Sequence, residues 1–227
     1  MKSIIKILLF VSIIMLSFFC IMSVLNPIRF ENEKNEREKS IIKRLIEIRK
    51  VEIEFKDQKG RYTASFDTLI MFVKNAKKKV VLKEGSLSDK QLEAGLTEAK
   101  AVSILRKGNY QEIAANGLQG FVRDTAYVNM LQALFPTEYT AETIDQIAII
   151  PFSNNEKFEL KVKNDYVNSA NIRIPLFQAT ASYESYLFDL NRQEMLNVID
   201  LQEKLEKYAG LKVGSVDEPN NNAGNWE

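Results

Sequence analysis

The sequence has no histidine and only one cysteine among its 227 residues. Histidine is the commonest general base, the usual activator of a catalytic serine or cysteine, and the commonest transition-metal ligand in proteins. Its absence removes most hydrolytic and metal-dependent mechanisms. The single Cys20 lies inside an apolar N-terminal run. The rest of the chain therefore has no disulfide, no thiolate metal site and no cysteine nucleophile.

The chain also lacks a net charge of either sign, because 31 basic residues oppose 30 acidic ones and leave a formal charge of +1. Such a chain has no overall field that would attract nucleic acid or an acidic substrate, so we expect no nucleic-acid partner. Hydrophobic residues make up 45% and charged residues 27% of the sequence. This composition is that of a folded protein and not of a disordered one.

Sequence motifs of catalysis are absent as well. We find no phosphate-binding glycine loop, dinucleotide fingerprint, metal-ligand spacing or nucleophile elbow. We therefore predict a protein that is not an enzyme, with no catalytic residue, no cofactor and no metal. A paired-carboxylate hydrolase or a Ser-Lys mechanism would need no histidine and stays open, but no spacing selects one.

An uncharged, mostly apolar run covers residues 7–25 and is flanked by Lys6 and Arg29. At about 1.5 Å per residue, it nearly crosses a hydrocarbon core of about 30 Å, so we predict a transmembrane helix after a short N-terminal segment, residues 1–6. A cleaved signal peptide is the first alternative, but its cleavage site needs small residues, and this run ends with bulky ones. A lipoprotein acylated at Cys20 is the second, but Phe19 stands where a small residue is usual.

The orientation follows less directly from the charges. More basic residues follow the run than precede it, and a strict count would place the C-terminal side in the cytoplasm. However, glutamates alternate with these basic residues, and large domains that follow an anchor often cross the membrane regardless of charge. We therefore expect a single-pass inner-membrane protein with a cytoplasmic N-terminus and a periplasmic C-terminal domain.

Residues 26–60 are nearly all good helix formers, and apolar side chains recur along one helical face at Ile41, Leu45, Ile48, Val51 and Phe55. This pattern predicts an amphipathic stalk helix that continues from the membrane, with a bend at Pro27, and ends at Gly60. The stripe is a candidate surface for association with other helices. It could equally pack on the chain's own domain.

Residues 61–218 are expected to form one soluble α+β domain, followed by an extended polar tail at residues 219–227. The expected helices run from Ser65, from Ser88 to Lys107, and between Asn191 and Tyr208 with Gly210 as terminator. The expected strands, rich in β-branched and aromatic residues, cover residues 121–128, 146–152, 157–163 and 171–179. Helices packed on an antiparallel sheet are the predicted architecture.

Two weaker interaction candidates lie outside the stalk. Lys77, Lys78 and Lys79 form a basic run that could contact anionic lipid headgroups, although a solubilising loop or sheet edge explains it more simply. Trp226 stands alone in the polar tail and could dock on a partner, but packing on its own domain is the simpler interpretation.

The succession of an apolar N-terminal helix, a proline, an amphipathic continuation and an antiparallel sheet resembles type IV pilins and type II secretion pseudopilins. Residues 55–63, with sequence FKDQKGRYT, resemble the pseudopilin segment in which the long helix ends. The pilin processing glycine and the glutamate near the start of the mature helix are absent. The C-terminal sequence GLKVGSVDEPNNNAGNWE also resembles uncharacterised membrane-anchored envelope proteins of the Bacteroidota.

These observations together predict a non-enzymatic envelope protein, a structural or scaffolding subunit of a pilus-like or secretion assembly. Its partners would be the lipid bilayer and other proteins, including copies of itself joined through the N-terminal helix. A membrane-anchored peptide- or glycan-binding module is the alternative, and it would require a concave site in the β-rich half.

Overall fold

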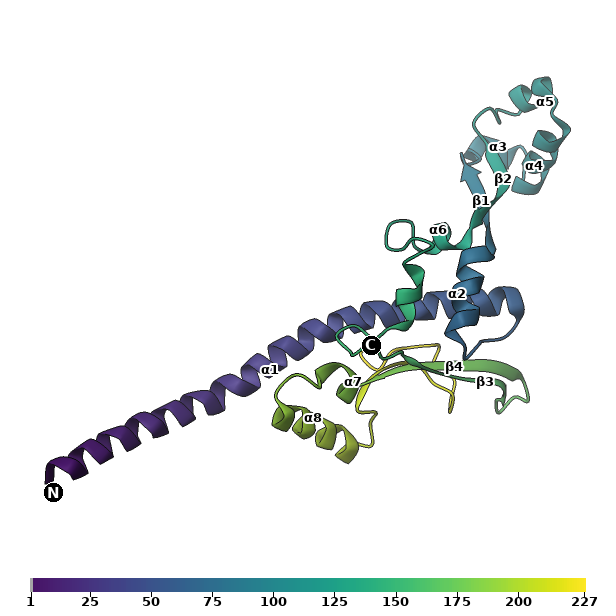
Figure 1. Cartoon of the computed structure of the whole chain (residues 1–227). Coiled ribbons are helices and arrows are strands. Elements are labelled where there is room, and N and C mark those ends of the chain that lie inside the picture. The colour runs from purple at the N-terminus through teal and green to yellow at the C-terminus, as the bar shows by residue number, and fades with distance from the viewer. Residues whose placement is uncertain (1) are drawn as a thin grey trace. The chain divides into compact units, whose positions relative to one another are not determined.

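The computed structural model describes residues 2–227, and for residues 2, 3, 81–83 and 123–125 the backbone alone is described. Met1, the first residue of the expected N-terminal segment 1–6, lies outside the described residues. The chain is α+β, with a long apolar N-terminal helix and antiparallel sheets (Figure 1). It forms two compact units. The second unit is Val73–Glu138, and the first unit consists of the segments before and after it. The soluble domain predicted over residues 61–218 includes the whole of Val73–Glu138.

Helix α1 (Lys2–Lys59) is one uninterrupted helix of 58 residues that includes both the predicted span and the predicted stalk (Figure 1). Pro27 lies inside it and removes one backbone donor without ending it. The helix ends at the predicted position, because Gly60 takes a φ of +75° and its N–H donates to the Lys56 carbonyl over 2.7 Å. A left-handed residue of this kind is a common helix terminator.

The first unit contains a three-stranded antiparallel sheet in the order β3 (Glu159–Val167), β4 (Arg173–Ser182), β5 (Gly210–Gly214). Strands β4 and β5 lie against the second half of α1. The predicted alternation of buried and exposed side chains at the start of β3 is confirmed, since Phe158 is buried while Glu159 and Lys161 are exposed. This alternation places one face of the sheet in the core.

The strand predicted at residues 146–152 is wrong. The segment begins in a 3-10 helix, η1 (Ile144–Ala148), and makes only an isolated bridge between Ile149 and Lys157. Ile147, Ala148 and Ile150 are all buried. A short apolar run that is buried on every side has no periodicity that separates a strand from a helical turn.

Two helices connect β4 to β5. They are α7 (Tyr183–Leu187) and α8 (Arg192–Lys204). The helix predicted between Asn191 and Tyr208 is present as α8, and the Asn191 side chain caps it by accepting from the N–H groups of Gln193 and Glu194. Its predicted terminator is not, because Gly210 is the first residue of β5, with a φ of +152° and the Ala181 carbonyl where a Cβ would stand.

The second unit is reached through α2 (Phe66–Asn75), whose start at Ser65 is confirmed by the bond from the Thr68 N–H to Ser65 Oγ at 3.3 Å. In this unit β1 (Lys77–Glu84) pairs antiparallel with β2 (Val122–Asn129) along its full length. A short helix, α6 (Met130–Leu134), follows β2. Strand β1 has no counterpart among the predicted strands.

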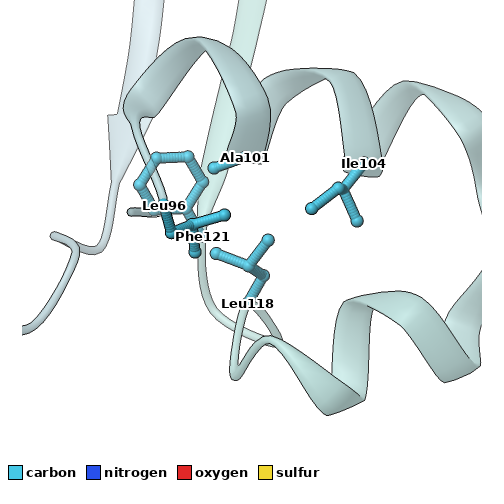
Figure 2. Close-up of a cluster of buried hydrophobic side chains, with 5 residues drawn as sticks. All are labelled: Leu96, Ala101, Ile104, Leu118 and Phe121. Atoms are coloured by element: carbon cyan, nitrogen blue, oxygen red, sulfur yellow. The ribbon is translucent and has the colours of Figure 1, made fainter. Parts of the chain in front are cut away.

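Between β1 and β2 lie three short helices, α3 (Asp89–Glu93), α4 (Glu98–Lys107) and α5 (Tyr110–Ala115). The capping box of Ser88 and Gln91 is confirmed, but the single helix predicted up to Lys107 is broken at Gly95, whose φ is +78°, and Thr97 caps a new helix. Figure 2 shows the small core of this region, formed by Leu96, Ala101, Ile104, Leu118 and Phe121, of which Ala101 and Ile104 belong to α4.

Candidate functional site

The first half of α1 exposes its apolar side chains all around the helix. Ile4, Leu16 and Ile28 are 66%, 64% and 52% exposed, and most of the large apolar residues between them are exposed as well, while Met22 and Leu25 are half-buried. This is the one described helix that is long and apolar enough to cross a membrane. Those properties are compatible with a membrane anchor, and they are shared by signal sequences and by core helices of soluble proteins.

The second half of α1 buries the predicted stripe in its own unit. Ile41 and Leu45 are fully buried, Ile48 and Val51 are 1% exposed, and Phe55 is 5% exposed and packs edge-on against Phe72. The apolar face of α1 therefore covers the sheet, which is the arrangement that the sequence leaves open as the alternative to helix association. In the folded chain these five side chains have no surface to offer a partner.

Polar contacts beside the stripe fix α1 to the rest of the unit. Arg37 binds both carboxylate oxygens of Asp189, at 2.5 and 2.8 Å, and donates to the Tyr186 carbonyl at 2.6 Å. Arg37 holds the pKa of the Asp189 carboxyl below its usual range, mainly by hydrogen bonding. The Tyr139 hydroxyl donates to the buried Glu47 carboxylate at 2.5 Å. These partners are more than 90 residues apart in the sequence, so no local sequence pattern predicts the contacts.

Glu52 is a fully buried carboxylate on α1. Its Oε2 accepts from the Thr63 N–H at 3.3 Å, while its Oε1 has no hydrogen-bond partner. Burial raises the pKa of Glu52 to about 8, and the Thr63 bond opposes the shift only in part. Because the side chain is enclosed, it has no contact with solvent through which a substrate could reach it.

The predicted basic run lies at the start of β1, where Lys77, Lys78 and Lys79 pair with Asn129, Val128 and Tyr127. Successive side chains of a strand point to opposite faces. Lys77 and Lys79 are accordingly exposed on one face, and Lys78 is half-buried on the other. The three lysines therefore do not form one continuous patch, and their contact with lipid headgroups stays a prediction.

The C-terminal tail, which the sequence predicts to lie extended, is tied to β5 and α1 within the first unit. Its Gly224 forms a bridge with Val213 of β5, and its Asn225 exchanges two hydrogen bonds with the Lys212 backbone, both of 3.0 Å. Glu227 forms a salt bridge with Arg49 of α1 at 2.7 Å. Trp226 is half-buried, and its ring lies over Gly224 where a Cβ would stand.

A cleft of about 490 Å³ opens beside this tail. It is bounded by α1, by α7, by the segment from α8 to β5, and by the tail itself. Its lining includes Glu38, Tyr183, Gln202, Tyr208, Lys212 and Trp226. Of these, only Trp226 is singled out by the sequence, because the others come from α1, α7 and the segment from α8 to β5 and share no motif.

The second unit has a cleft of its own, of about 520 Å³, between α3, α4 and α5. Among the described residues no group of three or more His, Cys, Asp or Glu side chains is placed to hold a metal ion. Comparison with protein-family models, with curated proteins and with solved structures finds no match to this chain.

Proposed function

We propose that this protein is a single-pass membrane-anchored envelope protein whose first unit is held close to the membrane by α1. The observation that carries the proposal is the contrast within that helix. Most apolar side chains of residues 4–28 are exposed, whereas the stripe from Ile41 to Phe55 is covered by the chain's own sheet. Water disfavours the first surface strongly, and a bilayer is the environment that it fits.

The proposed location is the inner membrane, with the folded units on the periplasmic side. Bulky residues at the end of the apolar run favour retention of the anchor over cleavage. The uninterrupted helix through Pro27 supports a direct connection between the anchor and the first unit.

Within that location, a structural or scaffolding role in a pilus-like or secretion assembly fits the layout best. One long helix with a free apolar half and a second half packed on an antiparallel sheet is the pilin-like arrangement that the sequence resembles. With the stripe covered, self-association would use residues 4–28. A non-enzymatic role is supported by the lack of histidine and by the enclosure of Glu52.

Two measurements test the anchor. N-terminal sequencing of the mature protein should find a start upstream of the apolar run, and the protein should stay in the membrane pellet after an alkaline carbonate wash. A mature protein that begins after Leu25, or that appears in the aqueous fraction without detergent, contradicts the proposal.

The native cysteine allows a test of self-association, because Cys20 is exposed within the apolar half of α1. Oxidation in membranes should give a disulfide-linked dimer in the native chain and none in Cys20→Ser. In that Cys-free background, cysteines placed singly from Ser17 to Val24 should cross-link with a period of three to four residues. Monomer at every position would exclude association through this helix.

Orientation is tested in the same Cys20→Ser background. A cysteine at the exposed Glu203 of α8 should react with a membrane-impermeant maleimide in intact spheroplasts. Reaction only after lysis would place the units in the cytoplasm.

A further inference from the structure

The cleft beside the C-terminal tail has the size of a ligand site, since small-molecule pockets commonly enclose about 300–1,000 Å³. It belongs entirely to the first unit and involves no residue of the apolar half of α1. Any function of this cleft is therefore independent of the proposed membrane anchor, and it can be tested separately.

Three aromatic side chains contribute to its walls. Tyr183 is buried, with its N–H bonded to the Ala209 carbonyl at 3.0 Å, while Tyr208 and Trp226 are half-buried. The Trp226 ring is held over Gly224 by a tail that is hydrogen-bonded to β5. Rigid aromatic surfaces of this kind provide contact area at a low entropic cost.

The polar groups of the cleft are mixed in character and balanced in charge. Glu38 and Glu206 contribute two carboxylates, Lys207 and Lys212 contribute two ammonium groups, and Gln202 can both donate and accept. Within the described part of the chain, no salt bridge engages Lys207 or Lys212. The two carboxylates and two ammonium groups give the lining a formal charge of zero, which suits an uncharged ligand.

A peptide fits this cleft less well. Extended peptides commonly bind by adding a strand to a free sheet edge. Here the edge of β5 is already occupied, because the tail bridges Val213 through Gly224 and the Gly214 N–H donates to the Ala223 carbonyl at 3.0 Å.

We propose that this cleft binds a neutral oligosaccharide. Sugar rings present an apolar C–H face that stacks on aromatic rings, and their hydroxyl groups both donate and accept hydrogen bonds. The combination of Tyr208 and Trp226 with Glu38, Gln202, Lys207 and Lys212 matches both properties, and the zero net charge matches an uncharged ligand.

The chain provides its own probe for this proposal, because Trp226 is its only tryptophan. The full chain in detergent is titrated with chitohexaose, cellohexaose and maltohexaose while tryptophan fluorescence is recorded. At least one of the three should give a saturable change in intensity or wavelength. No change with any of them up to 10 mM, or saturation only with a control hexapeptide, would overturn the proposal.

Variants locate the binding. Gln202→Ala should weaken binding at least fivefold without lowering the unfolding midpoint, since this half-buried side chain lies at the cleft surface. Calorimetry should show loss of binding in Trp226→Ala and its retention in Trp226→Phe, which keeps an aromatic face. Lys204→Ala is the matched control, because Lys204 pairs with Asp200 on the same helix outside the cleft. Equal binding by Gln202→Ala and the native chain would place the sugar elsewhere.

Discussion

The two halves of α1 belong to one continuous helix, but the first half exposes its apolar residues and the second half buries them. Leu16 is 64% exposed among apolar neighbours on all sides, whereas Leu45 is fully buried within a stripe whose opposite face is charged. A helix that is apolar all round needs an apolar solvent, and a helix with one apolar face needs a partner in the same protein. We therefore expect the first half to determine location and the second to determine stability.

The largest expected effect comes from breaking the first half. Ile13→Arg combined with Leu16→Arg places two charges in the middle of the span, at roughly 2.5–3.5 kcal/mol each on the insertion scale. The doubly substituted protein should leave the carbonate-washed membrane fraction while the first unit keeps its unfolding midpoint. Ile13→Leu with Leu16→Ile is the control and should stay in the membrane. Retention of the arginine variant would show that the span is not the anchor.

A substitution in the buried second half of α1 should lower stability and leave membrane association unchanged. Leu45→Ala leaves a cavity in a fully buried site and should destabilise the first unit by roughly 2–5 kcal/mol, with no change in membrane fractionation. Chemical denaturation of the protein in detergent measures this loss. Leu16→Ala serves as the matched substitution in the exposed half, and it should leave the free energy of unfolding almost unchanged. Similar losses from both substitutions would contradict the division of roles.

Glu52 gives a further test of the packed half of α1, because its carboxyl group is buried there. Its pKa is raised from about 4.5 in the unfolded chain to about 8 in the folded one. Between these values the folded state binds the proton more tightly than the unfolded state. The free energy of unfolding is therefore greatest below pH 4.5 and falls as the pH rises towards 8. Above pH 8 Glu52 is ionised in both the folded and the unfolded chain, and the free energy of unfolding falls no further.

Glu52→Gln should remove this dependence. We expect the variant to match the native chain below pH 4.5 and to be more stable by roughly 2–4 kcal/mol above pH 8, because the buried charge is gone. Urea unfolding at several pH values gives the comparison, with Glu203→Gln on the exposed face of α8 as the control. Parallel stability profiles for the native chain and Glu52→Gln would show that Glu52 is ionised at no cost in the folded state.

The parts of the fold that follow local rules could be predicted from the sequence. The stripe from Ile41 to Phe55 and the end of α1 at Gly60 rest on helical spacing and on one glycine, and the structure has both. Ser65, Ser88 and Asn191 likewise mark helix starts through side-chain caps, which depend on three or four neighbouring residues.

The parts that depend on distant partners could not be predicted. Strand β1 begins with three lysines and is stabilised by pairing with β2, whose paired residues lie 38 (Glu84 with Val122) to 52 (Lys77 with Asn129) positions later in the sequence. The polar tail has no strand pattern, but it is fixed by the Asn225 side chain, which binds the backbone at Gly210 and Lys212. The cleft beside the tail joins residues 38, 183, 202–212 and 225–226, so it exists only after the chain has folded.

The smallest expected effect concerns a contact close to the border between the two halves. Arg37 holds α7 and its following turn on α1 through Asp189 and the Tyr186 carbonyl. Since the Asp189 side chain is half exposed, Arg37→Ala should cost about 1 kcal/mol, more than a surface pair and less than a core residue. A double-mutant cycle with Asp189→Ala isolates the pair. Lys39→Ala, which breaks the fully exposed pair with Glu36, should cost close to nothing. If both substitutions cost the same, the bidentate geometry of Arg37 adds no stability, and packing of the apolar stripe alone holds α7 on α1.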